Sequence, residues 1–243
     1  MAAIVALSWL YLGRMGGGMV AMGGVVSAHA GMAMGGADAH ALALAFAMWA
    51  VMMMAMMLPT VAPSASMFST LEARRAAGGS NTATALYVAG YAASWVAFAI
   101  AAALAQWGLT QALLLDPMAR STNALLSSGI LLAAGIYQWT PLKNACLAKC
   151  RTPLAFFMAK WRDGAAGAFV LGLQHGGYCV ACCWALMAVM FVVGAMSLGW
   201  MAVFMLLVLG EKLLPVRLHF DRAIGAVLVV SGMWVAAGAW PGP

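Results

Sequence analysis

Three cysteines, a histidine and two methionines stand within residues 175–190, inside a long apolar run. Successive residues of a helix turn by about 100°, so these side chains share roughly one third of its circumference, with Met187 at the edge. The set comprises His175, Cys179, Cys182, Cys183, Met187 and Met190. Thiolate, thioether and imidazole ligands suit Cu(I), zinc or iron–sulfur clusters far better than magnesium or calcium. The stretch therefore indicates a soft-metal site, thiol chemistry, or close packing of small cysteine side chains.

The pair Cys179-x-x-Cys182 has a spacing that both metal ligands and thiol–disulfide catalysts use. The adjacent Cys183, and His175 one helical turn earlier, make the pattern more specific than one C-x-x-C. The alternative is that these cysteines serve as small hydrophobic residues at helix contacts. We favour ligand or redox use.

Cys146 and Cys150 form a second pair, spaced so that both thiols face one way if the segment is helical. The neighbouring Lys143, Lys149 and Arg151 are expected to lower the pKa of both thiols. A structural disulfide is not expected on the cytoplasmic side, where thiols stay reduced. The pair predicts a site of metal uptake or transfer, with inert interfacial cysteines as the alternative.

The segment 14–40 combines methionine and histidine among glycines. Thioether binds Cu(I) and imidazole also accepts Cu(II), so the composition is that of weak, exchangeable copper capture. The candidate ligands are His29, Met32, Met34 and His40. A membrane-associated loop in which Met replaces Leu is the alternative. The methionines at 48, 52 and 56 would share one helix face, which we interpret as core packing, with a Cu(I)-conducting ladder as the alternative if that face meets the cysteine helix.

The composition determines the fold class. Of 243 residues, 65% are hydrophobic and 7% charged, with a mean hydropathy of +0.96. These values predict an all-α, polytopic transmembrane helical bundle of about six to seven spans. We expect residues 1–40 to form a short apolar segment followed by an external Gly/Met/His-rich stretch, and residues 41–243 to form the transmembrane domain. The candidate spans are 2–13 (short for a span), 41–62, 83–107, 122–142, 165–194, 197–214 and 223–240.

Helix-breaking residues suggest two irregularities. Pro59 and Pro63 are expected to kink or end the second span. The run 165–194 is longer than a bilayer core, and Gly176-Gly177 is the natural place for a break or kink. The charge pair Glu211-Lys212 is expected to snorkel to the cytoplasmic interface at the end of the sixth span.

The basic residues predict the orientation. Ten of the twelve lysines and arginines lie in three loops that fall on one side of a seven-span bundle. The positive-inside rule places that side in the cytoplasm of a bacterial inner membrane, with the 14–40 segment and the C-terminus in the periplasm. The net charge of +6 then needs no nucleic-acid partner. Since five cysteines cannot all pair with one another, at least one thiol is free, ligated or bonded elsewhere.

Four motifs resemble a bacterial family of uncharacterised, predicted metal-binding integral membrane proteins. They lie at Trp49–Pro59, Gly135–Pro153, Gly176–Met187 and Glu211-Lys212, within a similarity over about residues 40–238. The resemblance implies a metal-binding membrane protein. It puts metal candidates on Cys146, Cys150, Cys179, Cys182 and Cys183.

We predict a membrane protein that binds a soft metal, copper or alternatively zinc, in metal transport, delivery or metalloenzyme assembly. Its expected partners are the lipid bilayer and either a membrane-protein complex or a metallochaperone. The sequence favours a non-enzymatic role, since it has no P-loop, dinucleotide-binding or H-E-x-x-H motif. The alternatives are an accessory subunit of a membrane oxidase or monooxygenase, and a membrane thiol–disulfide oxidoreductase.

Overall fold

The computed structural model describes residues 37–75, 81–116, 119–195, 197–214 and 218–238. Within these ranges the chain forms helices and no β-strand element, which confirms the predicted all-α class. The helices are α2 (Ala37–Arg75), α3 (Asn81–Gln111), α4 (Ala124–Tyr137), α5 (Pro141–Arg151), α6 (Pro153–Lys160), α7 (Gly164–Ala188), α8 (Met190–Val193), α9 (Leu198–Leu213) and α10 (Phe220–Ala236).

Three helical segments are long and apolar enough to cross a membrane. They are Ala39–Arg75, Asn81–Gln111 and Gly164–Val193. The apolar helices α4, α9 and α10 have only 14, 16 and 17 residues. A total of six to seven spans therefore remains a prediction, and the segment 2–13 lies outside the described residues.

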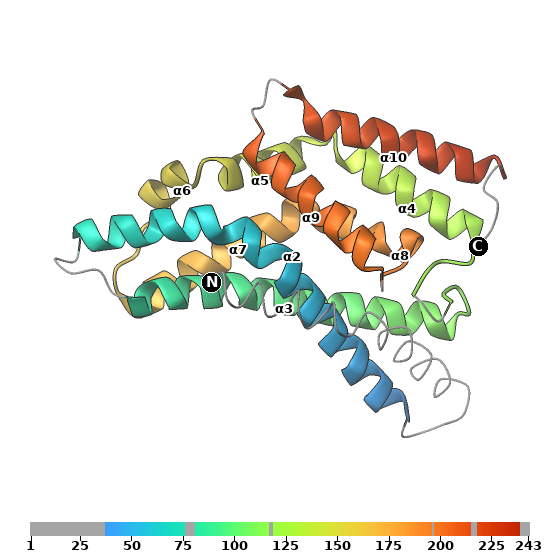
Figure 1. Cartoon of the computed structure of the whole chain (residues 1–243), viewed down its shortest axis with the longest axis horizontal. Coiled ribbons are helices and arrows are strands. Elements are labelled where there is room, and N and C mark those ends of the chain that lie inside the picture. Colours follow the sequence, from blue (N-terminus) through green and yellow to red (C-terminus); the bar gives the residue numbers. More distant parts are fainter. Residues whose placement is uncertain (1–36, 76–80, 117–118, 196, 215–217, 239–243) are drawn as a thin grey trace.

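Helix α2 continues where the sequence suggested that it could end. Pro59 and Pro63 lie inside the helix, which runs on to Arg75. Figure 1 shows α2 changing direction along its length, as a proline kink does. Proline deprives a carbonyl one turn earlier of its hydrogen bond. Next to Pro59, the Thr60 hydroxyl donates a hydrogen bond to the Met57 carbonyl oxygen at 2.9 Å.

Helix α7 is continuous through Gly176-Gly177, so the predicted break there is wrong. The helix instead ends at Ala188, and α8 follows at Met190. The small residues serve the packing of α3 against α7, which is the most extensive helix contact in the described chain. A Cβ atom on Gly172 would lie 1.9 Å from the Tyr87 carbonyl oxygen, and one on Gly176 would lie 2.6 Å from Ser94 Oγ. Glycine is thus required for the two backbones to approach.

Replacing Gly172 or Gly177 of α7 by alanine should change the stability of the protein in opposite directions. We expect Gly172→Ala to lower the free energy of unfolding by about 2 kcal/mol or more, because the added methyl group overlaps the backbone of α3. Gly177→Ala is the matched control, since nothing lies within 4 Å of its Cβ position. That variant should gain up to about 1 kcal/mol from helix propensity. Thermal unfolding in one detergent compares them, and equal effects would contradict the close crossing.

Helices α4, α5, α8 and α9 also contact α7. Helix α5 packs against α7, α9 contacts α2 and α5, and α4 pairs with α10. Figure 1 shows α4 and α10 side by side. Gly135 of α4 and Gly225 of α10 face each other there, because a Cβ on either would lie within about 3 Å of the other's carbonyl oxygen. The cysteine segment of α7 lies in the core, whereas Leu173 and Trp184 of the same helix are exposed.

Candidate metal centre

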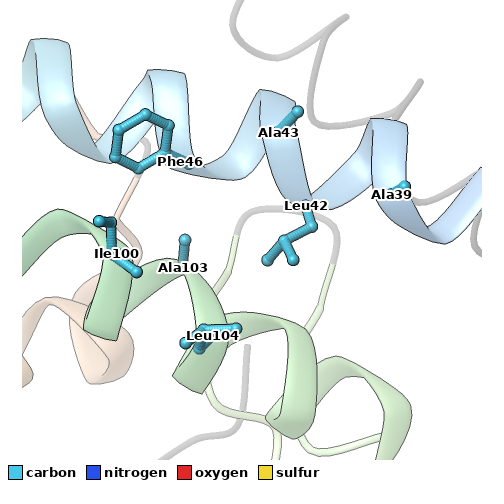
Figure 2. Close-up of a pocket in the computed structure, with 7 residues that line it drawn as sticks. All are labelled: Ala39, Leu42, Ala43, Phe46, Ile100, Ala103 and Leu104. Carbon is cyan, nitrogen blue, oxygen red and sulfur yellow. The ribbon is translucent and has the colours of Figure 1, made fainter.

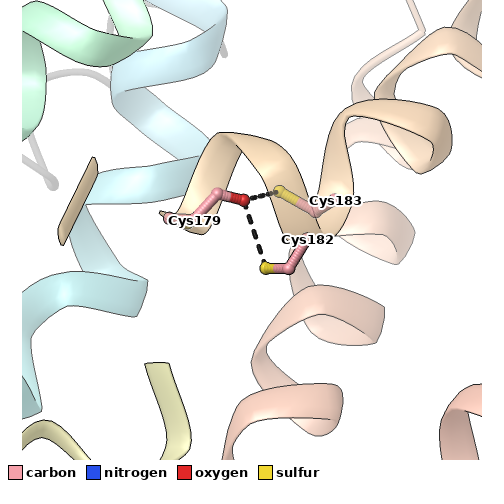
Figure 3. A group of neighbouring side chains, drawn as sticks. All are labelled: Cys179, Cys182 and Cys183. Atoms are coloured by element: carbon pink, nitrogen blue, oxygen red, sulfur yellow. Dashed lines mark hydrogen bonds between the residues drawn. The ribbon is translucent and has the colours of Figure 1, made fainter. Parts of the chain in front are cut away.

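The three cysteines of α7 form a compact sulfur cluster. Their Sγ atoms all lie within 4.8 Å of one another, and all three side chains are buried. The cause is helical spacing, since residues three and four apart are neighbours on one helix face. The Cys182 and Cys183 thiols donate hydrogen bonds to the Cys179 carbonyl oxygen at 3.1 and 2.9 Å (Figure 3). We call Cys179, Cys182 and Cys183 the sulfur cluster.

Helix α5 brings a fourth thiol to the sulfur cluster. The buried Cys150 hydrogen-bonds with Cys179 and Cys182. Cys146, one turn earlier on the same face, is also buried and lies within electrostatic range of Cys182. Sequence alone left open whether the two cysteine groups form one site or two. The packing of α5 against α7 brings them together, and all five thiols are unpaired.

The basic neighbours do not activate the thiols of α5 as the sequence suggested. Burial raises the pKa of Cys146, and hydrogen bonding to Cys179 raises the pKa of Cys150. The expected lowering is therefore wrong. The reason is that two of the three cations are engaged elsewhere: Lys143 pairs with Glu211, and Arg151 Nε donates to the Glu211 carbonyl oxygen at 2.7 Å.

Cys179 lies in a polar network drawn from four helices. Its Sγ is 3.1 Å from Lys212 Nζ of α9 and 3.1 Å from the Tyr91 hydroxyl of α3. Lys212 Nζ also donates to Thr60 Oγ1 of α2 at 2.8 Å. An ammonium group only donates, so the Cys179 sulfur accepts this hydrogen bond. Lys212 thus turns inward, and the prediction that it snorkels to an interface is wrong.

Glu211 is also inside the protein. Its carboxylate accepts a hydrogen bond from Lys143 Nζ at 2.6 Å, and both side chains are buried. Lys143 Nζ also donates to Gln138 at the end of α4. This buried ion pair joins α5 to α9, which is possible because the two helices pack together. The sequence showed the charged residues of the pair but not that they meet.

His175 lies outside the sulfur cluster. Among the described histidine, cysteine and acidic side chains, only the three cysteines of α7 form a group compact enough for one ion. The imidazole Nδ1 instead hydrogen-bonds with the Tyr87 hydroxyl. The rings of Tyr91, Phe156 and Phe157 surround it. The ring turns toward α3 and α6, so the structure does not group His175 with the three cysteines, and its use as a metal ligand stays a prediction.

The other predicted ligands divide into three cases. Met187 and Met190 are buried close to the cysteines along the chain, and their use as ligands stays a prediction. His40 is exposed in the first turn of α2. His29, Met32 and Met34 lie outside the described residues, so copper capture by the 14–40 segment also stays a prediction. Met52 and Met56 are buried in the core, in agreement with their interpretation as packing residues.

A cavity of ≈ 300 Å³ between α2 and α3 has no side chain suited to metal chemistry. Figure 2 shows its lining, which includes Leu42 and Phe46 of α2 and Ile100 and Leu104 of α3. All seven lining residues are apolar. This cavity therefore offers no ligand for a metal ion.

Comparison with known proteins agrees with this chemistry. Residues 46–235 match the PpoB2 family, which is described as a copper chaperone. The match covers more than half of the chain and includes α3 to α9 and all five cysteines, so the chain belongs to this family. Comparisons with curated proteins and with solved structures each found no significant match.

Proposed function

We propose, on the premise of this family membership, that the protein is a membrane-embedded chaperone that binds Cu(I) at the sulfur cluster and passes it on through Cys150. The observation that carries the proposal is the buried group of three sulfur atoms within 4.8 Å, with a fourth thiol supplied by another helix. The copper ion is the cargo of this site.

The donor set fits Cu(I) better than a hard cation. Thiolate sulfur selects Cu(I), zinc or iron–sulfur clusters, whereas magnesium and calcium need oxygen ligands. The compact ligand group of the described residues contains three cysteines and no carboxylate. Zinc remains the alternative ion, because it also accepts thiolates and takes four ligands in structural sites.

The position of Cys150 suggests how the ion would leave the sulfur cluster. Cys150 belongs to α5, whereas Cys179 and Cys182 belong to α7, and the three thiols are in hydrogen-bond contact. An ion held by α7 could therefore exchange one sulfur ligand at a time onto α5. Cys146 lies on the same face of α5 and would receive the ion next. This route would deliver copper to an acceptor metalloenzyme or a soluble metallochaperone.

Three membrane-length helices and the placement of basic residues support a site in the bacterial inner membrane. In this proposal the basic loops, including the connection before α7, face the cytoplasm. The transfer route would then run between the membrane interior and the cytoplasmic face. Burial of the cluster would keep competing water and oxygen ligands away from the ion.

Metal stoichiometry tests the proposed function. We expect the chain, purified in mild detergent under reducing conditions, to hold about one copper per chain after Cu(I) loading, as transition-metal affinity for thiolates predicts. Mass spectrometry of the metal content provides the measurement, with a parallel zinc loading. Protein that stays folded and takes up no copper would overturn the proposal. One tightly held zinc in place of copper would assign the site to zinc.

A further inference from the structure

Lys212 places a positive charge against the sulfur cluster. Its ammonium contacts Cys179 Sγ at 3.1 Å and Thr60 Oγ1 at 2.8 Å. Among the described residues, the single ion pair joins Lys143 to Glu211, so no described carboxylate pairs with Lys212. The partners of this ammonium are a hydroxyl group and the sulfur of a candidate ligand. The charge of Lys212 therefore belongs to the metal centre.

We propose that Lys212 is the specificity-determining residue of this centre, where its fixed charge favours a monovalent over a divalent ion. The inference rests on the proposed function, since it takes the sulfur cluster to be the copper site. A cysteine binds metal as the thiolate, so each ligating thiol releases its proton to the medium. When Cu(I) is held by two thiolates of the three-sulfur group and the third thiol keeps its proton, the ion, its ligands and the ammonium of Lys212 carry no net charge. A neutral assembly is the one that a buried, apolar site tolerates best.

A divalent ion with a complete set of ligands does not give a site of zero net charge. With Zn²⁺ and the ammonium of Lys212, two thiolates leave one positive charge and four leave one negative charge. Three thiolates balance the charges but supply one ligand fewer than the four that zinc takes in structural sites. Without Lys212 the preference reverses, because Zn²⁺ with two thiolates is neutral and Cu(I) with two thiolates is not.

Substitution of Lys212 tests this inference through a ratio of two affinities. We expect Lys212→Met to weaken Cu(I) binding relative to Zn(II) by on the order of 100-fold, since a charge in contact with a ligand sulfur is lost. Lys212→Arg keeps the charge and should keep the ratio within about tenfold. Lys160→Met is the matched control, because it removes the same charge from an exposed position on α6. Competition with chromophoric chelators gives both dissociation constants at one pH.

The outcomes separate this inference from the function on which it rests. Wild-type protein without copper would overturn both. Wild-type protein with copper, and Lys212→Met with an unchanged Cu(I)/Zn(II) ratio, would overturn the role of Lys212 and leave the chaperone proposal standing. Equal weakening of both ions with a lowered melting temperature would show that Lys212 holds helices together and does not select the ion. Thermal unfolding of each variant in the same detergent identifies that case.

Discussion

The double variant Cys182→Ser/Cys183→Ser is expected to lose stoichiometric copper. Two of the three sulfur atoms of the sulfur cluster are replaced by hydroxyl groups, which are poor ligands for Cu(I), so a single sulfur ligand remains. Loss of an outer-sphere partner of a metal ligand already reduces affinity about 10–100-fold, so loss of a ligand itself should exceed about 100-fold. Metal content per chain after Cu(I) loading, followed by chelator competition, measures the loss.

The fold should tolerate this double substitution. Both thiols donate to the Cys179 carbonyl oxygen, and a serine hydroxyl at either position can donate to the same atom. Cys146→Ser is the control, since Cys146 is also buried but lies outside the three-sulfur group. It should retain copper within about tenfold, as expected for a residue beyond the ligands. Full copper occupancy in the double variant would place the site elsewhere in the chain.

The helical class followed from composition, but the lengths of the helices did not. Apolar residues dominate both α2 and α9, yet α2 extends over 39 residues and α9 over 16. Pro59 and Pro63 were expected to end or kink a helix, and α2 passes through both with a bend. In the folded chain the Thr60 hydroxyl, between these two prolines, donates a hydrogen bond to the Met57 carbonyl oxygen, and the Tyr91 hydroxyl of α3 lies 3.3 Å from the same Thr60 hydroxyl. Contacts of this kind depend on how the helices pack, so they could not be predicted from the sequence of α2 alone.

The site was predictable in its ligand types and not in its surroundings. Spacing alone brought Cys179, Cys182 and Cys183 onto one face of α7, and the structure groups them. His175 shares that stretch of sequence, but Tyr87 and the aromatic side chains of α6 hold its ring elsewhere. Lys212 was assigned to an interface because lysine avoids apolar surroundings. Its partners come from helices distant in sequence, so tertiary packing decided the outcome.

The pair between Lys143 and Glu211 links the metal centre to the rest of the bundle. Relative exposure of the two side chains is 0% and 1%, with 2.6 Å between the charged atoms. One carboxylate oxygen of Glu211 has no hydrogen-bond partner among the described residues, so Lys143 supplies most of its compensation. Lys143 belongs to the same short helix as Cys146 and Cys150. The ion pair therefore helps to hold α5, which carries these two thiols, against α9.

Lys143→Met is expected to destabilise the protein by about 3–5 kcal/mol, because removing one partner leaves a buried charge uncompensated. The second partner can then be removed as well: Lys143→Met/Glu211→Leu should recover most of that loss, since two apolar side chains need no charge compensation. Lys149→Met, at an exposed position of the same helix, should stay within about 0.5 kcal/mol of wild type. Thermal unfolding of the wild type and the three variants in one detergent measures these differences. If Lys143→Met and Lys149→Met unfold alike, the ion pair does not stabilise α5. If the double variant falls as far as the single one, apolar side chains do not replace the pair, and the contact depends on specific hydrogen bonds among Lys143, Glu211 and Gln138.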